Sequence, residues 1–153
     1  MHRLFVTVTA LTAALVLAGG AAAWSWPADG ALLRPFALGS DAYAAGQHRG
    51  IDVGGTDGSP VRAPVSGTIS FAGSVPSSGR GVTIATADGY SVTLFHLGSL
   101  AVAKGETVAE GVTVGLMGMS GDAEQASPSV HLGVRRTAEA EGYVDPLGLL
   151  PAR

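Results

Sequence analysis

The feature of this chain that most constrains its fold is a regular alternation of apolar and polar residues in several short runs. Apolar side chains fall on every second position in the segments 67–72, 81–86 and 90–95. Side chains of an extended strand point alternately to opposite faces, so each run predicts a strand with one buried face. The dipeptide Asp88-Gly89 separates the last two runs and predicts a hairpin with a type I′ turn.

The same reading extends to both ends of the chain. Short extended segments are predicted at 61–64, 102–108 and 112–118, and the last clear strand is 129–135. In that strand Ser129, His131 and Gly133 share one face, while Val130, Leu132 and Val134 share the other. The segment 31–47 shows no such pattern and is predicted to be irregular, and 120–127 is predicted to be a surface loop.

The composition agrees with a mainly β protein. Of the 153 residues, 46% are hydrophobic, only 14% are charged, and 23 are glycine, which favours short strands and tight turns. The formal net charge of −3 lacks the basic stripe that phosphate binding needs, so nucleic acid is not expected as a partner. We expect one domain of antiparallel sheets over residues 24–153, which is a usual domain length.

Residues 1–23 have the pattern of an export signal. His2 and Arg3 precede an apolar run from Leu4 to Leu17, and small residues lead up to Trp24. The run is shorter than the roughly 18 apolar residues of a membrane span, so cleavage near Ala23 is favoured over an uncleaved anchor. We therefore expect an exported protein, either secreted or held in the cell envelope. The sequence contains no cysteine, so neither a disulfide nor a lipid attached to cysteine can hold it.

Three of the four histidines, His48, His96 and His131, lie in segments that together indicate a metal site. His48 and Asp52 are four residues apart beside a glycine-rich turn, and His131 lies on the last predicted strand. Imidazole and carboxylate groups are common zinc ligands, and a loop carrying the first pair could fold over the strand face that carries His131. The alternative is that each histidine is an ordinary surface or hydrogen-bonded core residue. A serine triad is not favoured, since no nucleophile-elbow pattern surrounds any serine.

Six segments occur in an order that carries more information than any one of them. They include His48-Arg49-Gly50-Ile51-Asp52, Leu94-Phe95-His96-Leu97 and Val144-Asp145-Pro146, and the other three are 58–69, 105–115 and 127–135. In this order the chain resembles the lysostaphin-type zinc metallopeptidases, the LytM-like family of peptidoglycan endopeptidases. The resemblance covers nearly all of residues 24–153.

The resemblance implies the lysostaphin-type fold, also called the duplicated hybrid motif. It implies that His48, Asp52 and His131 hold one Zn²⁺ with a position left open for water, as a catalytic zinc requires. It also implies that His96 is a catalytic residue that helps to polarise the attacking water. The implied substrates are the peptide stems or cross-bridges of bacterial peptidoglycan, and a monomer is expected.

Ser129 stands where the family has a second assisting histidine, two residues before His131. Serine does not titrate near neutral pH, so it cannot exchange protons as imidazole does. General acid–base assistance is worth about 10²–10⁴-fold in rate, so reduced activity is expected. Two smaller departures are Phe95, where the family usually has a small residue, and Gly133, where glutamate is common.

Two functions follow from these observations, and a third is more distant. The first is a zinc metalloendopeptidase acting on peptidoglycan, with activity reduced by Ser129. The second is a module of the same fold without catalysis, which binds the cell wall or regulates a partner hydrolase. The third is a carbohydrate-binding domain that uses Trp24 and Trp26, although packing of these two rings on the outside of the domain is the simpler interpretation.

Overall fold

The computed structural model describes residues 22–41, 43–122 and 125–153. The predicted leader lies almost entirely outside these residues. The described chain is built from two antiparallel sheets, and its one helical element is a short 3₁₀ turn, η1 (Pro146–Gly148). None of the described residues form a helix of the length and apolarity needed to cross a membrane.

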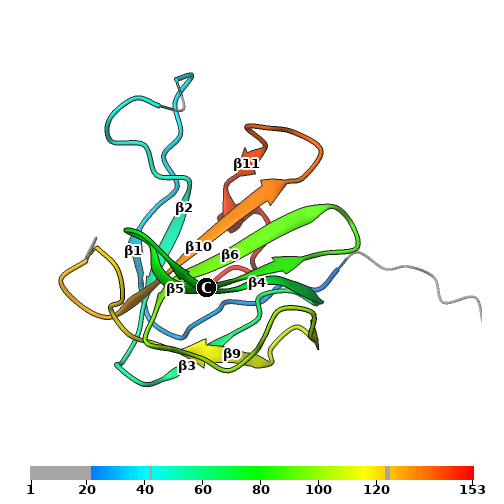
Figure 1. The fold of residues 1–153 in the computed structure, drawn as a ribbon. Helices are drawn as coiled ribbons and strands as arrows, with labels where there is room; N and C mark the ends of the chain where they lie inside the picture. Colours follow the sequence, from blue (N-terminus) through cyan, green and yellow to red (C-terminus); the bar gives the residue numbers. More distant parts are fainter. Residues whose placement is uncertain (1–21, 42, 123–124) are drawn as a thin grey trace, which may run out of the picture.

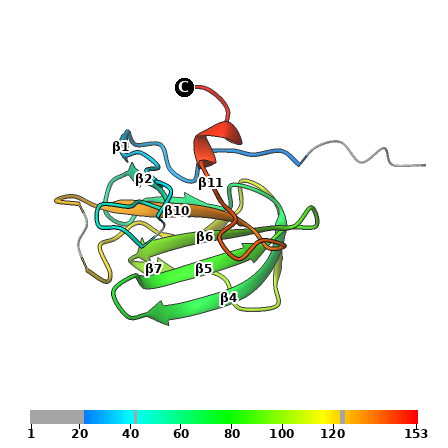
Figure 2. The same ribbon diagram turned by 90° about the horizontal axis from the view of Figure 1, so that it is seen from above.

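The main sheet has its strands in the order β1-β2-β10-β6-β5-β4-β8, and β11 pairs with β10 beyond the end of β2. Figure 2 shows its strands lying side by side. Its members are β1 (Leu32–Arg34), β2 (Gly50–Gly54), β4 (Gly67–Val75), β5 (Gly79–Ala85), β6 (Tyr90–Leu97), β8 (Thr107–Val108), β10 (Ser129–Arg136) and β11 (Tyr143–Val144).

A smaller sheet packs against one face of the main sheet. It contains β3 (Pro60–Arg62), β9 (Thr113–Leu116) and β7 (Ser99–Leu100), and Figure 1 shows β3 and β9 as a second layer. The predicted alternation is confirmed here, because Val92, Leu94 and Leu132 are fully buried in the core between the layers. Burial of each such side chain is worth about 1.5–3 kcal/mol. The opposite face of the main sheet is therefore left to carry polar residues.

The N-terminal aromatic pair packs on the domain, as the simpler interpretation predicts. Trp24 lies edge-on to Tyr90 with ring centroids 5.8 Å apart. The indole N–H of Trp26 donates to the carbonyl of Pro151 at 2.8 Å, and the Arg153 guanidinium lies 3.9 Å from the centre of the Trp26 ring. Both rings thus hold parts of the chain together, which leaves the carbohydrate-binding hypothesis without support.

Two sequence predictions about local structure need correction. The Asp88-Gly89 hairpin joins β5 and β6 as predicted, but only Gly89 has a positive φ, of 89°, so the turn is not type I′. The Thr86 N–H donates to the Tyr90 carbonyl, so the hairpin loop has three residues between Thr86 and Tyr90. Loops of three residues usually consist of a type I turn followed by a glycine with left-handed backbone. The segment 31–47 is not wholly irregular, because it contains β1, whose side chains are too exposed to produce a pattern.

Candidate metal centre

Asp52 and His131 face each other across two paired strands. β2 and β10 are antiparallel, and their register sets Asp52 directly opposite His131. Their neighbours Ile51 and Leu132 are fully buried in the core, so both ligand candidates point to the opposite face of the sheet. The expectation that Asp52 comes from a loop is wrong: a five-residue strand, buried throughout, holds it.

His48 is fixed just before β2 by contacts to the preceding segment. Its backbone N–H and carbonyl both bond to Ala37, at 2.7 and 2.9 Å. Its side-chain Nδ1 lies 2.8 Å from the carbonyl oxygen of Pro35, which can only accept a hydrogen bond, so Nδ1 carries the proton. In the neutral ring Nε2 then presents a lone pair, which is the form that a metal ligand needs.

The structure brings all three predicted ligand atoms together. His48 Nε2 lies 3.2 Å from His131 Nδ1 and 3.2 Å from Asp52 Oδ1, and the last two atoms are 3.0 Å apart. Tetrahedral zinc with bonds of about 2.0–2.1 Å separates its ligand atoms by about 3.3–3.4 Å. An opening of a few tenths of an ångström would therefore admit the ion. The donor set of two imidazoles and one carboxylate fits zinc, and His48, Asp52 and His131 could together hold a metal ion. We call these three residues the metal group.

A residue that the sequence analysis missed, Gln125, contacts the Asp52 carboxylate. Its amide nitrogen donates to Asp52 Oδ2 at 3.0 Å, which leaves Oδ1 facing the two imidazoles. Burial of the Asp52 carboxyl raises its pKa, but the hydrogen bonds from His131 and Gln125, together with the electrostatic attraction of the two imidazoles, outweigh burial and hold the pKa below its ordinary value. No motif singles out Gln125 within its polar loop, so only the folded chain identifies it.

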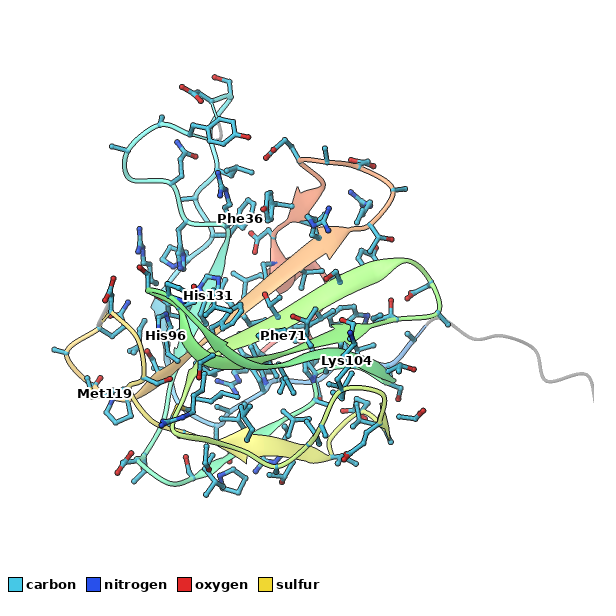
Figure 3. The ribbon with its side chains drawn as sticks, in the orientation of Figure 1. Phe36, Phe71, His96, Lys104, Met119 and His131 are labelled. Atoms are coloured by element: carbon cyan, nitrogen blue, oxygen red, sulfur yellow. The ribbon has the colours of Figure 1, made fainter. Side chains whose placement is uncertain are left out.

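His96 lies beside this group at the end of β6. Its ring stands edge-on to that of His131, with centroids 6.4 Å apart, and Figure 3 shows the two histidines at the same end of the sheet. Nδ1 of His96 lies 2.9 Å from the carbonyl oxygen of Ser120, so Nδ1 carries a proton, and in the neutral ring Nε2 then presents a lone pair. The Ser120 hydroxyl is in turn fixed, since it donates to the Leu97 carbonyl at 2.6 Å.

The backbone at His96 explains how the ring reaches the site. Alternation along β6 would turn residue 96 toward the core, together with Leu94 and Val92, which are both fully buried. A φ of 67° at His96 breaks the alternation, so that Phe95 and His96 both line the same groove. Positive φ is uncommon outside glycine, and backbone outliers of this kind cluster at functional sites.

Ser129 occupies the predicted place beside the metal group. It is 7% exposed, it precedes His131 by one strand period, and it pairs with Gly54 of β2. Together with His96 and Gln125 it lines a small hollow under the loop that follows β9. The hollow thus holds a hydroxyl where the family resemblance implies a second imidazole, and Gln125 lines the same hollow.

A groove runs from the metal group across the open face of the main sheet. Its floor consists of side chains from β5, β6 and β10, and Arg49 and Tyr143 line one side of it. The remaining lining residues are Ser77, Ser78, Thr83, Ser91, Thr93, Phe95, His96, Asp122, His131, Gly133, Val134 and Arg135. An extended chain could lie in this groove with one of its peptide bonds next to the metal group.

The sequence is similar to those of several bacterial proteins. The chain is 34% identical over 140 residues to the lipoprotein NlpD/LppB homolog of Pseudomonas aeruginosa, covering 90% of this chain and 43% of that protein. It is 28% identical over 132 residues to the murein hydrolase activator NlpD of Salmonella dublin, covering 86% of this chain and 32% of the relative. The chain thus spans less than half the length of these curated relatives.

The fold matches solved structures as well. The catalytic domain of the antimicrobial peptidase lysostaphin from Staphylococcus simulans superposes with a TM-score of 0.64 and 27% identity, covering 78% of this chain and 88% of that domain. The profile of peptidase family M23 matches residues 46–146, which include His48, Asp52, His96 and His131. This match spans most of the described domain, and the expected lysostaphin-type β fold is confirmed. The chain belongs to peptidase family M23.

Proposed function

We propose that the protein is a zinc metalloendopeptidase that acts on the peptide portion of bacterial peptidoglycan, with low turnover. The observation that carries the proposal is the convergence of His48 Nε2, Asp52 Oδ1 and His131 Nδ1 within 3.0–3.2 Å of one another at the end of an open groove. The likeness to lysostaphin, an antimicrobial peptidase, and to a murein hydrolase activator supports the choice of substrate.

In this proposal His48, Asp52 and His131 hold one zinc ion. When bound, zinc supplies Lewis acidity, which polarises a peptide carbonyl and makes water easier to deprotonate. The groove positions the peptide, and Gln125 keeps the Asp52 carboxylate turned toward the two imidazoles. His96 is the proton carrier, because its Nδ1–H stays bonded to the Ser120 carbonyl while Nε2 accepts a proton and returns it to the leaving amine.

The test combines metal content with hydrolysis of purified cell walls. The mature protein should contain about one zinc per chain, as a three-ligand site predicts, and His48→Ala or His131→Ala should lose it. His96→Asn is the matched control, since it removes a nearby imidazole outside the ligand set and should keep zinc. Full zinc occupancy in both alanine variants would refute the assignment of ligands.

A second function is favoured by Ser129. The hydroxyl replaces one of two expected assisting imidazoles, and a relative named as a murein hydrolase activator matches most of this chain. A module that binds the wall or a partner hydrolase would keep the groove without turnover. Zinc-loaded protein that binds purified walls but releases no new amino groups, alone or after Ser129→His, would favour this function over the peptidase.

The cellular setting belongs to the same proposal. We propose export through the leader 1–23 and action in the cell envelope, which agrees with the description of the Pseudomonas relative as a lipoprotein. A single domain over residues 24–153 that acts as a monomer completes the proposal. Analytical sedimentation of the mature protein measures whether it is a monomer.

A further inference from the structure

The groove changes character along its length. Register places Phe95 beside His131, then Thr93 beside Gly133, then Ser91 beside Arg135. Two residues of strand rise about 6.6–6.8 Å, so Arg135 lies roughly 13 Å along β10 from the metal group. Between the metal group and Arg135 the floor of the groove is low, because the row of paired residues there consists of Thr83, Thr93 and Gly133, which have small side chains or none.

The far end of the groove is basic. Arg135 and Arg49 both line it, whereas Asp122, the one carboxylate among the described lining residues, belongs to the other end. The backbone N–H of Asp122 donates to the Ser77 carbonyl at 2.7 Å. The next residue, Ser78, accepts the backbone N–H of His96, so Asp122 lies at the end of the groove near His96. The chain as a whole carries a formal net charge of −3, so this basic end is a local feature.

Both arginines are held in place by their surroundings. The Arg49 guanidinium stacks on Tyr143 and Tyr43, at 5.2 and 5.6 Å from the ring centres. Arg135 pairs with Tyr143 in the sheet, and its Nη1 donates to the Glu139 backbone carbonyl at 3.2 Å. Among the described residues Arg135 forms no ion pair with a carboxylate, so its charge is available to a ligand in the groove. Fixed guanidinium groups favour carboxylates because they lose little freedom on binding.

Gly133 keeps this end open and without negative charge. A Cβ added there would lie 2.8 Å from Thr93 Oγ1, a side-chain atom that can rotate away. A glutamate at this position would place a carboxylate in the row next to Arg135. Its absence leaves the positive charge of the arginine facing the groove.

We propose that the groove selects peptides with a free carboxylate about four residues from the bond that lies at the metal group, and that Arg135, assisted by Arg49, binds this carboxylate. The spacing follows from an extended peptide, which rises by about the same distance per residue as β10. The inference rests on the proposed function and specifies its ligand: an acidic peptide segment rather than the uncharged glycan or an amidated peptide.

The test compares binding of the mature, zinc-loaded protein to two forms of purified peptidoglycan. One form is untreated, and in the other the carboxyl groups have been converted to amides with carbodiimide and ammonia. Co-sedimentation should show binding to the untreated form that is at least about tenfold tighter, as a charge-assisted contact predicts. General electrostatics act in the opposite sense, because a chain with net negative charge is repelled by the untreated wall.

Variants assign the effect to the groove. Arg135→Gln and Gly133→Glu should each weaken binding to the untreated wall by about tenfold and leave binding to the amidated wall unchanged. Gly133→Gln is matched in size to Gly133→Glu without its charge, and Arg136→Gln removes an exposed arginine next to Arg135 that does not line the groove. Arg136→Gln should bind like the unchanged protein, and Gly133→Gln should lose clearly less binding than Gly133→Glu. Thermal melting and zinc content establish that each variant is folded.

The outcomes separate this inference from the proposed function. Equal binding or hydrolysis of both walls by the unchanged protein would overturn carboxylate selection and leave the peptidoglycan function standing. Equal losses in Gly133→Glu and Gly133→Gln would also overturn it, since size rather than charge would then matter. Failure to bind or cleave either wall would overturn both.

Discussion

His96 combines an unusual backbone with a fixed ring. Its φ of 67° lies in a region that asparagine enters more readily than most residues, and its Nδ1 is tied to the Ser120 carbonyl. His96→Asn therefore keeps the backbone acceptable and offers an amide N–H to the same carbonyl, while removing the proposed proton carrier.

We predict that His96→Asn lowers cell-wall hydrolysis by about 10²–10⁴-fold, the usual worth of general acid–base assistance. Zinc content and thermal stability should stay near those of the unchanged protein, because the ring is outside the group of three ligand atoms. Amino groups released from purified walls measure the rate. A matching loss of zinc would make His96 a ligand instead.

Substitution of Ser129 tests the proposal that turnover is low. We predict that Ser129→His raises hydrolysis by up to about 10²–10⁴-fold with little change in zinc affinity, because the position shares a strand face with His131. Ser129→Asn is the control that adds a polar group without a proton carrier. Turnover in the unchanged protein equal to that of relatives with both histidines would contradict the prediction.

At the scale of secondary structure, the pairing of β2 with β10 builds the metal group. Gly50 lies against β10: a Cβ there would stand 2.3 Å from the Leu132 carbonyl oxygen and 2.7 Å from His131 Nε2. The first contact is with backbone and cannot be relieved by rotating a side chain. The strands must separate to admit even one methyl group, and Asp52 and His131 would separate with them.

We predict that Gly50→Ala destabilises the protein by about 1–3 kcal/mol, the usual cost of overpacking, and weakens zinc binding. Gly148→Ala is the matched control, because its added Cβ would meet no heavy atom within 4 Å. Thermal unfolding and zinc titration of both variants provide the comparison. If Gly50→Ala melts and binds zinc like Gly148→Ala, the close approach of the two strands does not set the geometry of the site.

At the scale of the whole molecule, the predicted leader of residues 1–23 lies almost entirely outside the described residues. The apolar run Leu4–Leu17, followed by small residues up to Ala23, predicts removal during export. We predict that mass spectrometry of the exported protein finds Trp24 or a near neighbour at the N-terminus. Recovery of the intact chain from the cytoplasm would refute export, and an intact chain in the membrane would indicate an uncleaved anchor.

The sequence alone determined the features that depend on local chemistry. Alternation of apolar residues along 90–95 and 129–135 predicted β6 and β10 and the faces of their side chains, because strand geometry fixes a period of two. Ordered motifs identified His48, Asp52, His96 and His131, and the structure brings these four together. Their chemical roles stay predictions.

Tertiary structure decided what depends on distant pairing. Asp52 belongs to a strand rather than a loop because β2 pairs with β10, where Asp52 lies opposite His131. These two residues are far apart in the sequence, so no local pattern predicts their pairing. Gln125 reaches Asp52 only through the path of its loop, and the left-handed backbone of His96 depends on contacts with Ser78 and Ser120. The basic end of the groove likewise arises where Arg49 and Arg135 meet around Tyr143. Long-range contacts of this kind are made only when the sheet closes, and a sequence read residue by residue does not contain them.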